Sequence, residues 1–110
     1  MILIKNGRLV DPLSKRDEVV DIVIEKDKIK EIGKNLNQDG FEYVIDATGC
    51  VVAPGLIDIH VHFRDPGFTY KEDIFSGAKA AAKGGFTTVV CMANTKPVVD
   101  NKDTLKYILD

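Results

Sequence analysis

Histidine occurs only twice in this chain, and both copies lie in one short stretch. His60 and His62 are two residues apart in the sequence DIHVHF, within a run of Ile and Val that reads as a β-strand. Side chains at positions i and i+2 of a strand point to the same face, so both imidazoles can reach one bound ion. Neutral imidazole nitrogens bind Zn²⁺ at about 2.0–2.1 Å, and burying two imidazoles without partners is costly. The spacing therefore indicates a zinc site; the alternative is an ordinary pair bonded to backbone carbonyls or carboxylates.

Two histidines do not complete a catalytic zinc site, which usually has three protein ligands and a water. Asp58 and Asp65 are the nearest carboxylates that could add to the set. Asp58 lies deeper along the expected strand, and Asp65 begins a turn with Pro66, so neither is favoured as a direct ligand. We expect the remaining ligands to lie beyond Asp110.

The histidines lie at the end of the first element in a segment where strands and helices alternate. Residues 56–63 predict a strand, with Asp58, His60, His62 and Arg64 on one face and the apolar side chains on the other. Residues 72–85 predict a helix that starts with a capping box of Thr69 and Glu72 and stops at two glycines. Its apolar face is expected to consist of Ile74, Phe75, Ala78, Ala81 and Ala82.

A second strand and a second helix follow, at residues 86–92 and 102–110. This order predicts a parallel sheet and an α/β fold. One βαβ unit and part of another helix cannot cover both faces of such a sheet. We therefore expect the chain to be truncated, as the N-terminal piece of a longer protein.

The first half of the chain is rich in short strands separated by turns. Residues 2–10 predict a hairpin at Asn6-Gly7, and residues 19–32 predict two strands around the turn EKDK. Residues 43–55 predict one more strand. Together, these short strands suggest a small antiparallel sheet or β-sandwich. The expected division is a β-sandwich portion at residues 1–53 and a βαβα portion at residues 54–110.

Composition argues against several classes of function. The formal net charge is −2, with 15 basic and 17 acidic residues, which does not favour a nucleic-acid or membrane-surface partner. There is no signal-peptide pattern and no apolar run long enough for a membrane span. Cys50 and Cys91 are expected to be buried free thiols. A cytoplasmic location is the default for such a chain.

Two long motifs resemble a known family. PGLIDIHVHFRDPG and YKEDIFSGAKAAAKGGFTTVVCMANTKP are similar to the beginning of the bacterial dihydroorotases, within the amidohydrolase superfamily, over residues 49–97. The resemblance implies the start of a (β/α)₈ TIM-like barrel preceded by a small β-sandwich, and an active site with one or two Zn²⁺ ions. One departure is Ala93, where the family usually has proline; this affects only the local stiffness of the loop.

By the same resemblance, His60 and His62 are zinc ligands, Arg64 binds the substrate carboxylate and Asn94 also contacts the substrate. The general acid/base aspartate is expected beyond Asp110, so no catalytic residue falls within the chain. A planar guanidinium suits a carboxylate because it can form two parallel hydrogen bonds. The alternatives are a surface salt bridge from Arg64 to Asp65 or Asp73, and a turn-forming role for Asn94.

The implied activity is the interconversion of N-carbamoyl-L-aspartate and (S)-dihydroorotate, a step of pyrimidine biosynthesis. Residues 1–110 alone are expected to be inactive. The alternatives are an allantoinase, a dihydropyrimidinase-like cyclic amidase, or a non-catalytic structural partner of another pyrimidine enzyme. A homodimer and an association with aspartate carbamoyltransferase are the partners that the resemblance suggests.

Overall fold

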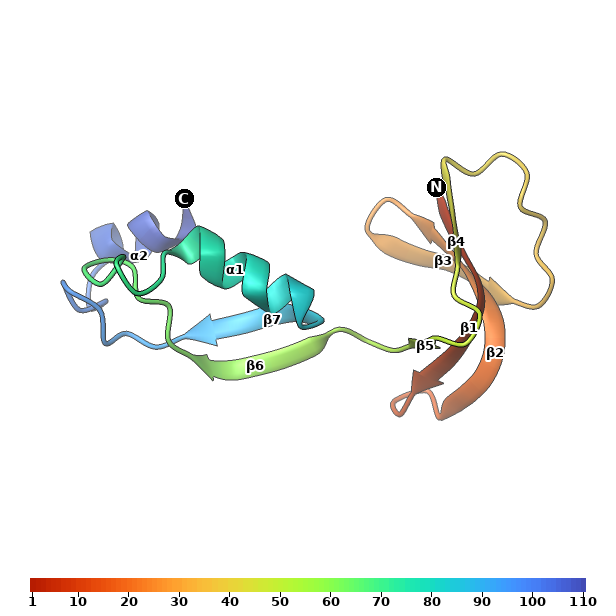
Figure 1. The fold of residues 1–110 in the computed structure, drawn as a ribbon, viewed down its shortest axis with the longest axis horizontal. Helices are drawn as coiled ribbons and strands as arrows, with labels where there is room; N and C mark the ends of the chain where they lie inside the picture. The colour runs from red at the N-terminus through yellow and green to blue at the C-terminus, as the bar shows by residue number, and fades with distance from the viewer. The chain divides into compact units, whose positions relative to one another are not determined.

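Seven strands and two helices divide between two units in the computed structural model, which describes residues 1–110 (Figure 1). The first unit is Met1–Pro54 and the second is Gly55–Asp110. The sheet of the first unit has five strands: β1 (Ile2–Asp11), β2 (Arg16–Glu25), β3 (Lys28–Gly33), β4 (Tyr43–Asp46) and β5 (Val51–Val52).

The strands of the first unit form one mixed sheet in the order β3-β2-β1-β4, with β5 also paired to β1. β2 is antiparallel to both β1 and β3, whereas β4 and β5 run parallel to β1. The prediction of an antiparallel sheet is therefore wrong for the last two strands. The single strand expected at residues 43–55 is also divided, because a turn closed by the bond from Cys50 N to Ala47 O interrupts it. All five strands of this unit belong to this one sheet.

Asn6-Gly7 forms a bulge and not the predicted hairpin. β1 continues through both residues, and its register with β2 shifts between Ile4 and Gly7. Asn6 has a φ of 61°, a left-handed conformation that asparagine tolerates better than most residues. Hairpin turns and bulges both use this conformation, so the dipeptide alone does not distinguish them. The turn predicted between β2 and β3 is confirmed, with Lys26 at a φ of 56°.

A compact apolar core lies on the sheet of the first unit. Leu9, Val20 and Ile22 pack together, and Leu3 is fully buried. Cys50 is exposed and Cys91 is half-buried, and both are free. The prediction of buried thiols is thus wrong for Cys50, which follows the exposed turn before β5.

The second unit begins with two parallel strands connected by a helix. β6 (Leu56–Val61) pairs with β7 (Phe86–Cys91), and α1 (Ile74–Lys83) connects them. α2 (Lys102–Leu109) follows. The predicted βαβ unit with a second helix is therefore confirmed, and the chain has mixed α/β structure. Neither helix is long and apolar enough to span a membrane.

The start of α1 differs from the prediction. Its capping box consists of Asp73 and Ser76: Asp73 Oδ1 accepts from Ser76 N at 2.7 Å, and Ser76 Oγ accepts from Asp73 N at 3.2 Å. Thr69 and Glu72 have the same i, i+3 spacing but lie before the helix. The predicted stop is confirmed, because Gly84 caps α1 and Gly85 takes a φ of 86°.

The face of α1 that lies against the strands also differs from the predicted one. Small residues line the space between α1 and the strands: Gly77, Ala80, Ala81 and Gly84. A Cβ atom on Gly77 would lie 2.8 Å from the Phe63 ring, so glycine permits this close approach. Ile74, Phe75 and Ala78 instead line a groove with Tyr107 and Ile108 of α2. The apolar face of α1 is therefore shared between the strands and α2.

Candidate metal and substrate site

The two histidines meet at the end of β6. Their Nε2 atoms are 3.2 Å apart, and the rings are inclined at 61°. Two nitrogens bound to one tetrahedral ion at about 2.0–2.1 Å would be about 3.3–3.4 Å apart. The observed separation is close to this distance, and it also suits an N–H···N hydrogen bond. In both arrangements the two Nε2 atoms point toward each other, as the spacing in the sequence predicts.

An irregular strand end places the histidines. β6 ends at Val61, so His62 and Arg64 lie past the strand and not within it. The pairing of β6 with β7 shifts register between Asp58 and Val61, and Asp58 Oδ1 accepts from His60 N at 2.9 Å. Because a register shift breaks the two-residue alternation, the predicted division into two faces fails. Asp58 lines the same cavity as Val61 and Phe63.

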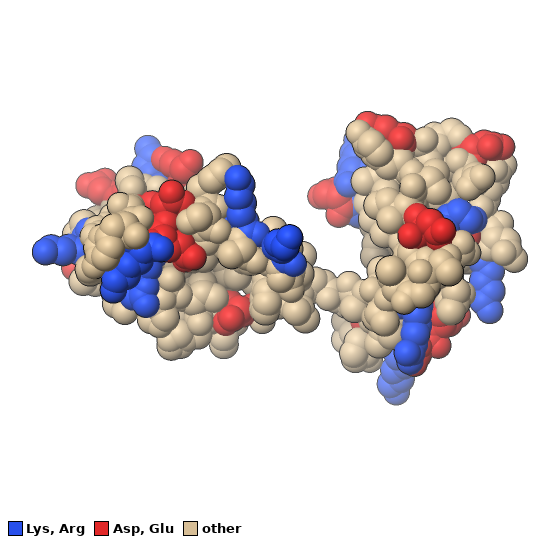
Figure 2. All heavy atoms as spheres, viewed as in Figure 1, with Lys and Arg blue, Asp and Glu red and all other residues tan.

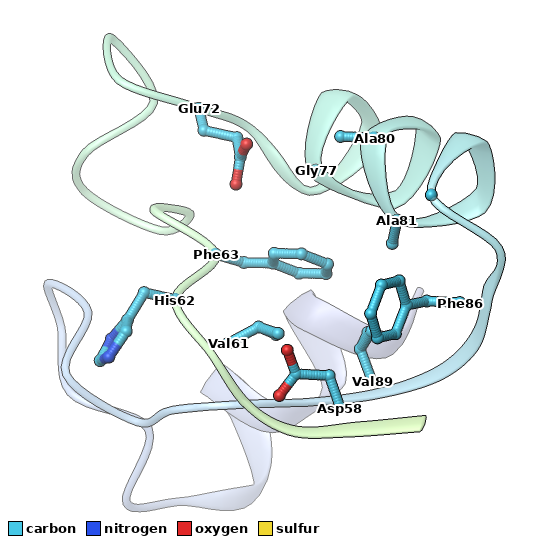
Figure 3. Close-up of a pocket in the computed structure, with 11 residues that line it drawn as sticks. Asp58, Val61, His62, Phe63, Glu72, Gly77, Ala80, Ala81, Phe86 and Val89 are labelled. Atoms are coloured by element: carbon cyan, nitrogen blue, oxygen red, sulfur yellow. The ribbon is translucent and has the colours of Figure 1, made fainter. Parts of the chain in front are cut away.

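That cavity, about 250 Å³ in volume, lies between α1 and the two strands (Figure 3). The side chains of Phe63, Ala81 and Phe86 face one another across it, while the His62 ring points away from them. The cavity is therefore the packing space beneath α1. His62 belongs to the lining of this cavity as well, but both histidines are exposed and meet each other through their Nε2 atoms.

Asn94 reaches the histidines from the loop after β7. Its Oδ1 atom lies 3.0 Å from His62 Nδ1. A carbonyl oxygen only accepts hydrogen bonds, so His62 Nδ1 donates, and the Nε2 lone pair is then free for an ion. The bond that a metal-binding imidazole makes through its other nitrogen fixes the ring orientation. Sequence reasoning placed Asn94 near the substrate but missed its contact with His62.

Arg64 makes no salt bridge. The four ion pairs of the structure all lie in the first unit: Lys5–Asp21, Arg8–Asp17, Arg16–Glu18 and Lys30–Glu25. The alternative in which Arg64 pairs with Asp65 or Asp73 is therefore not what the structure shows. The half-buried guanidinium has no carboxylate partner within the chain.

Asp65 is buried and bonded to other parts of the second unit. Its Oδ1 atom accepts from Tyr107 Oη at 2.7 Å, and its Oδ2 atom accepts from Ile74 N at 3.4 Å. The hydrogen bond to Asp65 raises the pKa of Tyr107 above its usual value. Neither Asp65 nor Asp58 joins the histidines, and the structure has no cluster of three or more metal-ligating side chains.

Comparison with known proteins identifies the family. The model of the Dihydro-orotase-like family matches residues 49–110, more than half of the chain. The chain belongs to the dihydroorotase-like family. It is 68% identical over 108 residues to a dihydroorotase of Clostridioides difficile (strain 630), and 59% identical over 110 residues to one of Clostridium acetobutylicum. These alignments cover 98% and 100% of this family member and 26% of each relative.

A solved structure extends the likeness beyond sequence. L-Hydantoinase (dihydropyrimidinase) from Arthrobacter aurescens matches this dihydroorotase-like chain with a TM-score of 0.78 and 30% identity, over 96% of this chain and 23% of that one. The chain thus spans about a quarter of the length of the relatives that it matches. The resemblance to bacterial dihydroorotases is confirmed, and it extends through the first unit as well as residues 49–97.

Proposed function

We propose that this chain contributes the first part of the active site of a zinc-dependent dihydroorotase. The reaction is the interconversion of N-carbamoyl-L-aspartate and (S)-dihydroorotate, in the synthesis of pyrimidines. The observation that carries the proposal is the convergence of His60 Nε2 and His62 Nε2, 3.2 Å apart, close to the unpaired Arg64 in sequence. In this proposal, residues 1–53 belong to a β-sandwich and residues 54–110 begin a (β/α)₈ barrel.

His60 and His62 are the residues that would hold the zinc. Their Nε2 atoms converge, and Asn94 keeps the proton of His62 on the opposite ring nitrogen. When bound, zinc supplies Lewis acidity and activates water at neutral pH. The remaining ligands, a possible second ion and the acid/base aspartate would come from outside residues 1–110, so residues 1–110 alone are expected to be inactive.

Arg64 would recognise the exocyclic carboxylate of dihydroorotate. Its guanidinium has no internal carboxylate partner, and it can form two parallel hydrogen bonds to such a group. Asn94 lies beside His62 and would help to orient the substrate from the same side. Holding the carboxylate places the bound substrate with its ring amide near the reacting groups.

A second candidate is a cyclic amidase of the dihydropyrimidinase type, which the likeness to a hydantoinase favours. Dihydrouracil and allantoin lack the ring carboxylate of dihydroorotate. An arginine dedicated to that carboxylate therefore favours dihydroorotase over both alternatives. The two free cysteines support a cytoplasmic enzyme, and a homodimer and aspartate carbamoyltransferase are proposed partners on family membership alone.

The test uses the full-length protein that carries these residues, assayed with dihydroorotate, dihydrouracil and allantoin. We expect turnover of dihydroorotate, and we expect Arg64→Ala to raise its KM by about 10–100-fold, since hydrogen bonds to charged groups are each worth about 1.5–3 kcal/mol. The zinc content should not change. Arg16→Ala, at the exposed start of strand β2, is the matched control and should leave KM unchanged.

Three results would contradict the proposal. Loss of zinc in Arg64→Ala would show that this arginine supports the metal site and not the substrate. Comparable turnover of dihydrouracil and dihydroorotate would favour the dihydropyrimidinase alternative. An inactive full-length protein with an intact fold would instead support a structural partner.

A further inference from the structure

Asp65 occupies an unusual position for a carboxylate next to a substrate-binding arginine. It follows Arg64 directly in the sequence, yet its side chain is 8% exposed and makes no ion pair with that arginine. Its two oxygens accept from the hydroxyl of Tyr107, on α2, and from the first backbone N–H of α1. The carboxylate is thus tied to both helices of the second unit.

The loop that carries Arg64 is also held by backbone contacts. Phe68 N donates to Arg64 O at 2.8 Å, and Lys96 N donates to Pro66 O at 3.0 Å. A Cβ atom on Gly67 would lie 2.3 Å from Lys96 O, so the two loops touch where only glycine fits. These contacts fix the backbone of the loop but leave the direction of the Asp65 side chain to Tyr107 and α1.

An unbound carboxylate at position 65 would compete with substrate for Arg64. Guanidinium groups pair strongly with carboxylates, and adjacent residues of a short loop are within reach of each other. Tyr107 Oη, at 2.7 Å, satisfies one oxygen of Asp65 and holds it away from that role. A tyrosine hydroxyl is protonated at neutral pH, so it can donate to Asp65 there.

We propose that Tyr107 is a positioning residue for substrate binding: by holding Asp65, it keeps Arg64 free to bind the substrate carboxylate. This inference rests on the proposed dihydroorotase function. Tyr107 acts through Asp65 and touches neither substrate nor metal in this scheme. It therefore affects the affinity for substrates with a carboxylate, and not the chemical step.

The first experiment is Tyr107→Phe in the full-length protein, which removes the hydroxyl and keeps the ring. We expect the KM for dihydroorotate to rise about three- to tenfold, as for the loss of one ordinary hydrogen bond, with kcat and zinc content unchanged. Tyr70→Phe is the matched control, because Tyr70 is 79% exposed and lies in the loop before α1. It should leave KM unchanged.

The second experiment separates competition for Arg64 from general damage to the fold. The double variant Tyr107→Phe with Asp65→Asn removes the competing charge, so KM should return toward the wild-type value. A purely structural role predicts no such rescue. An unchanged KM in Tyr107→Phe, or a double variant that is no better than the single one, would overturn the inference. A wild-type protein without dihydroorotase activity would overturn the proposed function itself, and the inference with it.

Discussion

The two units of the chain are held together in different ways. All of the buried large apolar side chains, among them Leu3, Leu9 and Ile22, belong to the first unit. The buried side chains of the second unit are polar: Asp65, Thr95 and Thr104. Ile57 and Ile59 of β6 are 65% and 72% exposed. Within residues 1–110, the first unit therefore buries a hydrophobic core, whereas hydrogen bonds between loops and helix ends position the site in the second.

The two units do not differ in this way in the charged side chains on the face shown in Figure 2. On the face shown in Figure 2, both basic and acidic side chains are scattered among uncharged ones over each unit. This agrees with the net charge of −2. The difference between the units thus lies in what each one buries.

The largest expected effect is a loss of stability when a buried apolar side chain of the first unit is shortened, compared with an exposed one of the second unit. Leu3→Ala, at a side chain with 0% exposure, should lower the free energy of unfolding of the chain by about 2–5 kcal/mol, since it leaves a cavity in the core. Ile59→Ala removes a similar volume at a side chain that is 72% exposed. It should change the free energy of unfolding by less than about 0.5 kcal/mol. Urea denaturation monitored by circular dichroism measures both. Equal losses would mean that the contrast in burial does not govern stability.

The fold was predictable wherever the sequence pattern is local. The two strands around Lys26, the turn between them and the βαβ order all follow from neighbouring residues. The conformation of Asn6-Gly7 and the start of α1 were not predictable, because each local pattern fits two structures. Pairing with β2 decides that Asn6 forms a bulge: its N–H donates to Asp21 Oδ1 at 2.9 Å, a contact between residues 15 positions apart.

The next largest effect concerns the one buried polar cluster of the first unit. Asp21 accepts from Lys5 Nζ and from the backbone N–H groups of Asn6 and Leu36, each at 2.9 Å. Asp21→Ala leaves the two backbone N–H groups without an acceptor and Lys5 with only the Leu36 carbonyl, and should cost roughly 2 kcal/mol of unfolding free energy. Asp17→Ala, four residues earlier on the same strand, breaks an exposed pair with Arg8 and should have little effect. Similar losses in both variants would contradict the assignment of Asp21 as a buried anchor.

The effect of Asp21 should depend on pH in a defined direction. Burial raises the pKa of Asp21, but the Lys5 ammonium and the two backbone donors outweigh it, so the pKa lies below the ordinary value of 3.8. A pKa that is lower in the folded state gives stability that is fully present above that ordinary value and is lost as the pH falls through the folded one. The difference between wild type and Asp21→Ala should therefore be largest near neutral pH and shrink in acid.

The site was predictable from the sequence in part. The spacing of His60 and His62 requires only a local extended segment, so their convergence could be foreseen. The contacts of Asn94 with His62 and of Tyr107 with Asp65 join residues 32 and 42 positions apart. Such contacts depend on how loops pack at the ends of β6 and β7, and no local pattern encodes them. The Tyr107→Phe variant tests, with a smaller effect than the core substitutions, whether these polar contacts position the site.

The most direct test of the account is the position of zinc in the full-length protein. Crystals measured at the zinc absorption edge should show an anomalous peak within bonding distance of both His60 Nε2 and His62 Nε2, and His60→Ala should lose most of the bound zinc. If the wild-type crystals show no peak there and the imidazoles are bonded to main-chain oxygens, the account is contradicted.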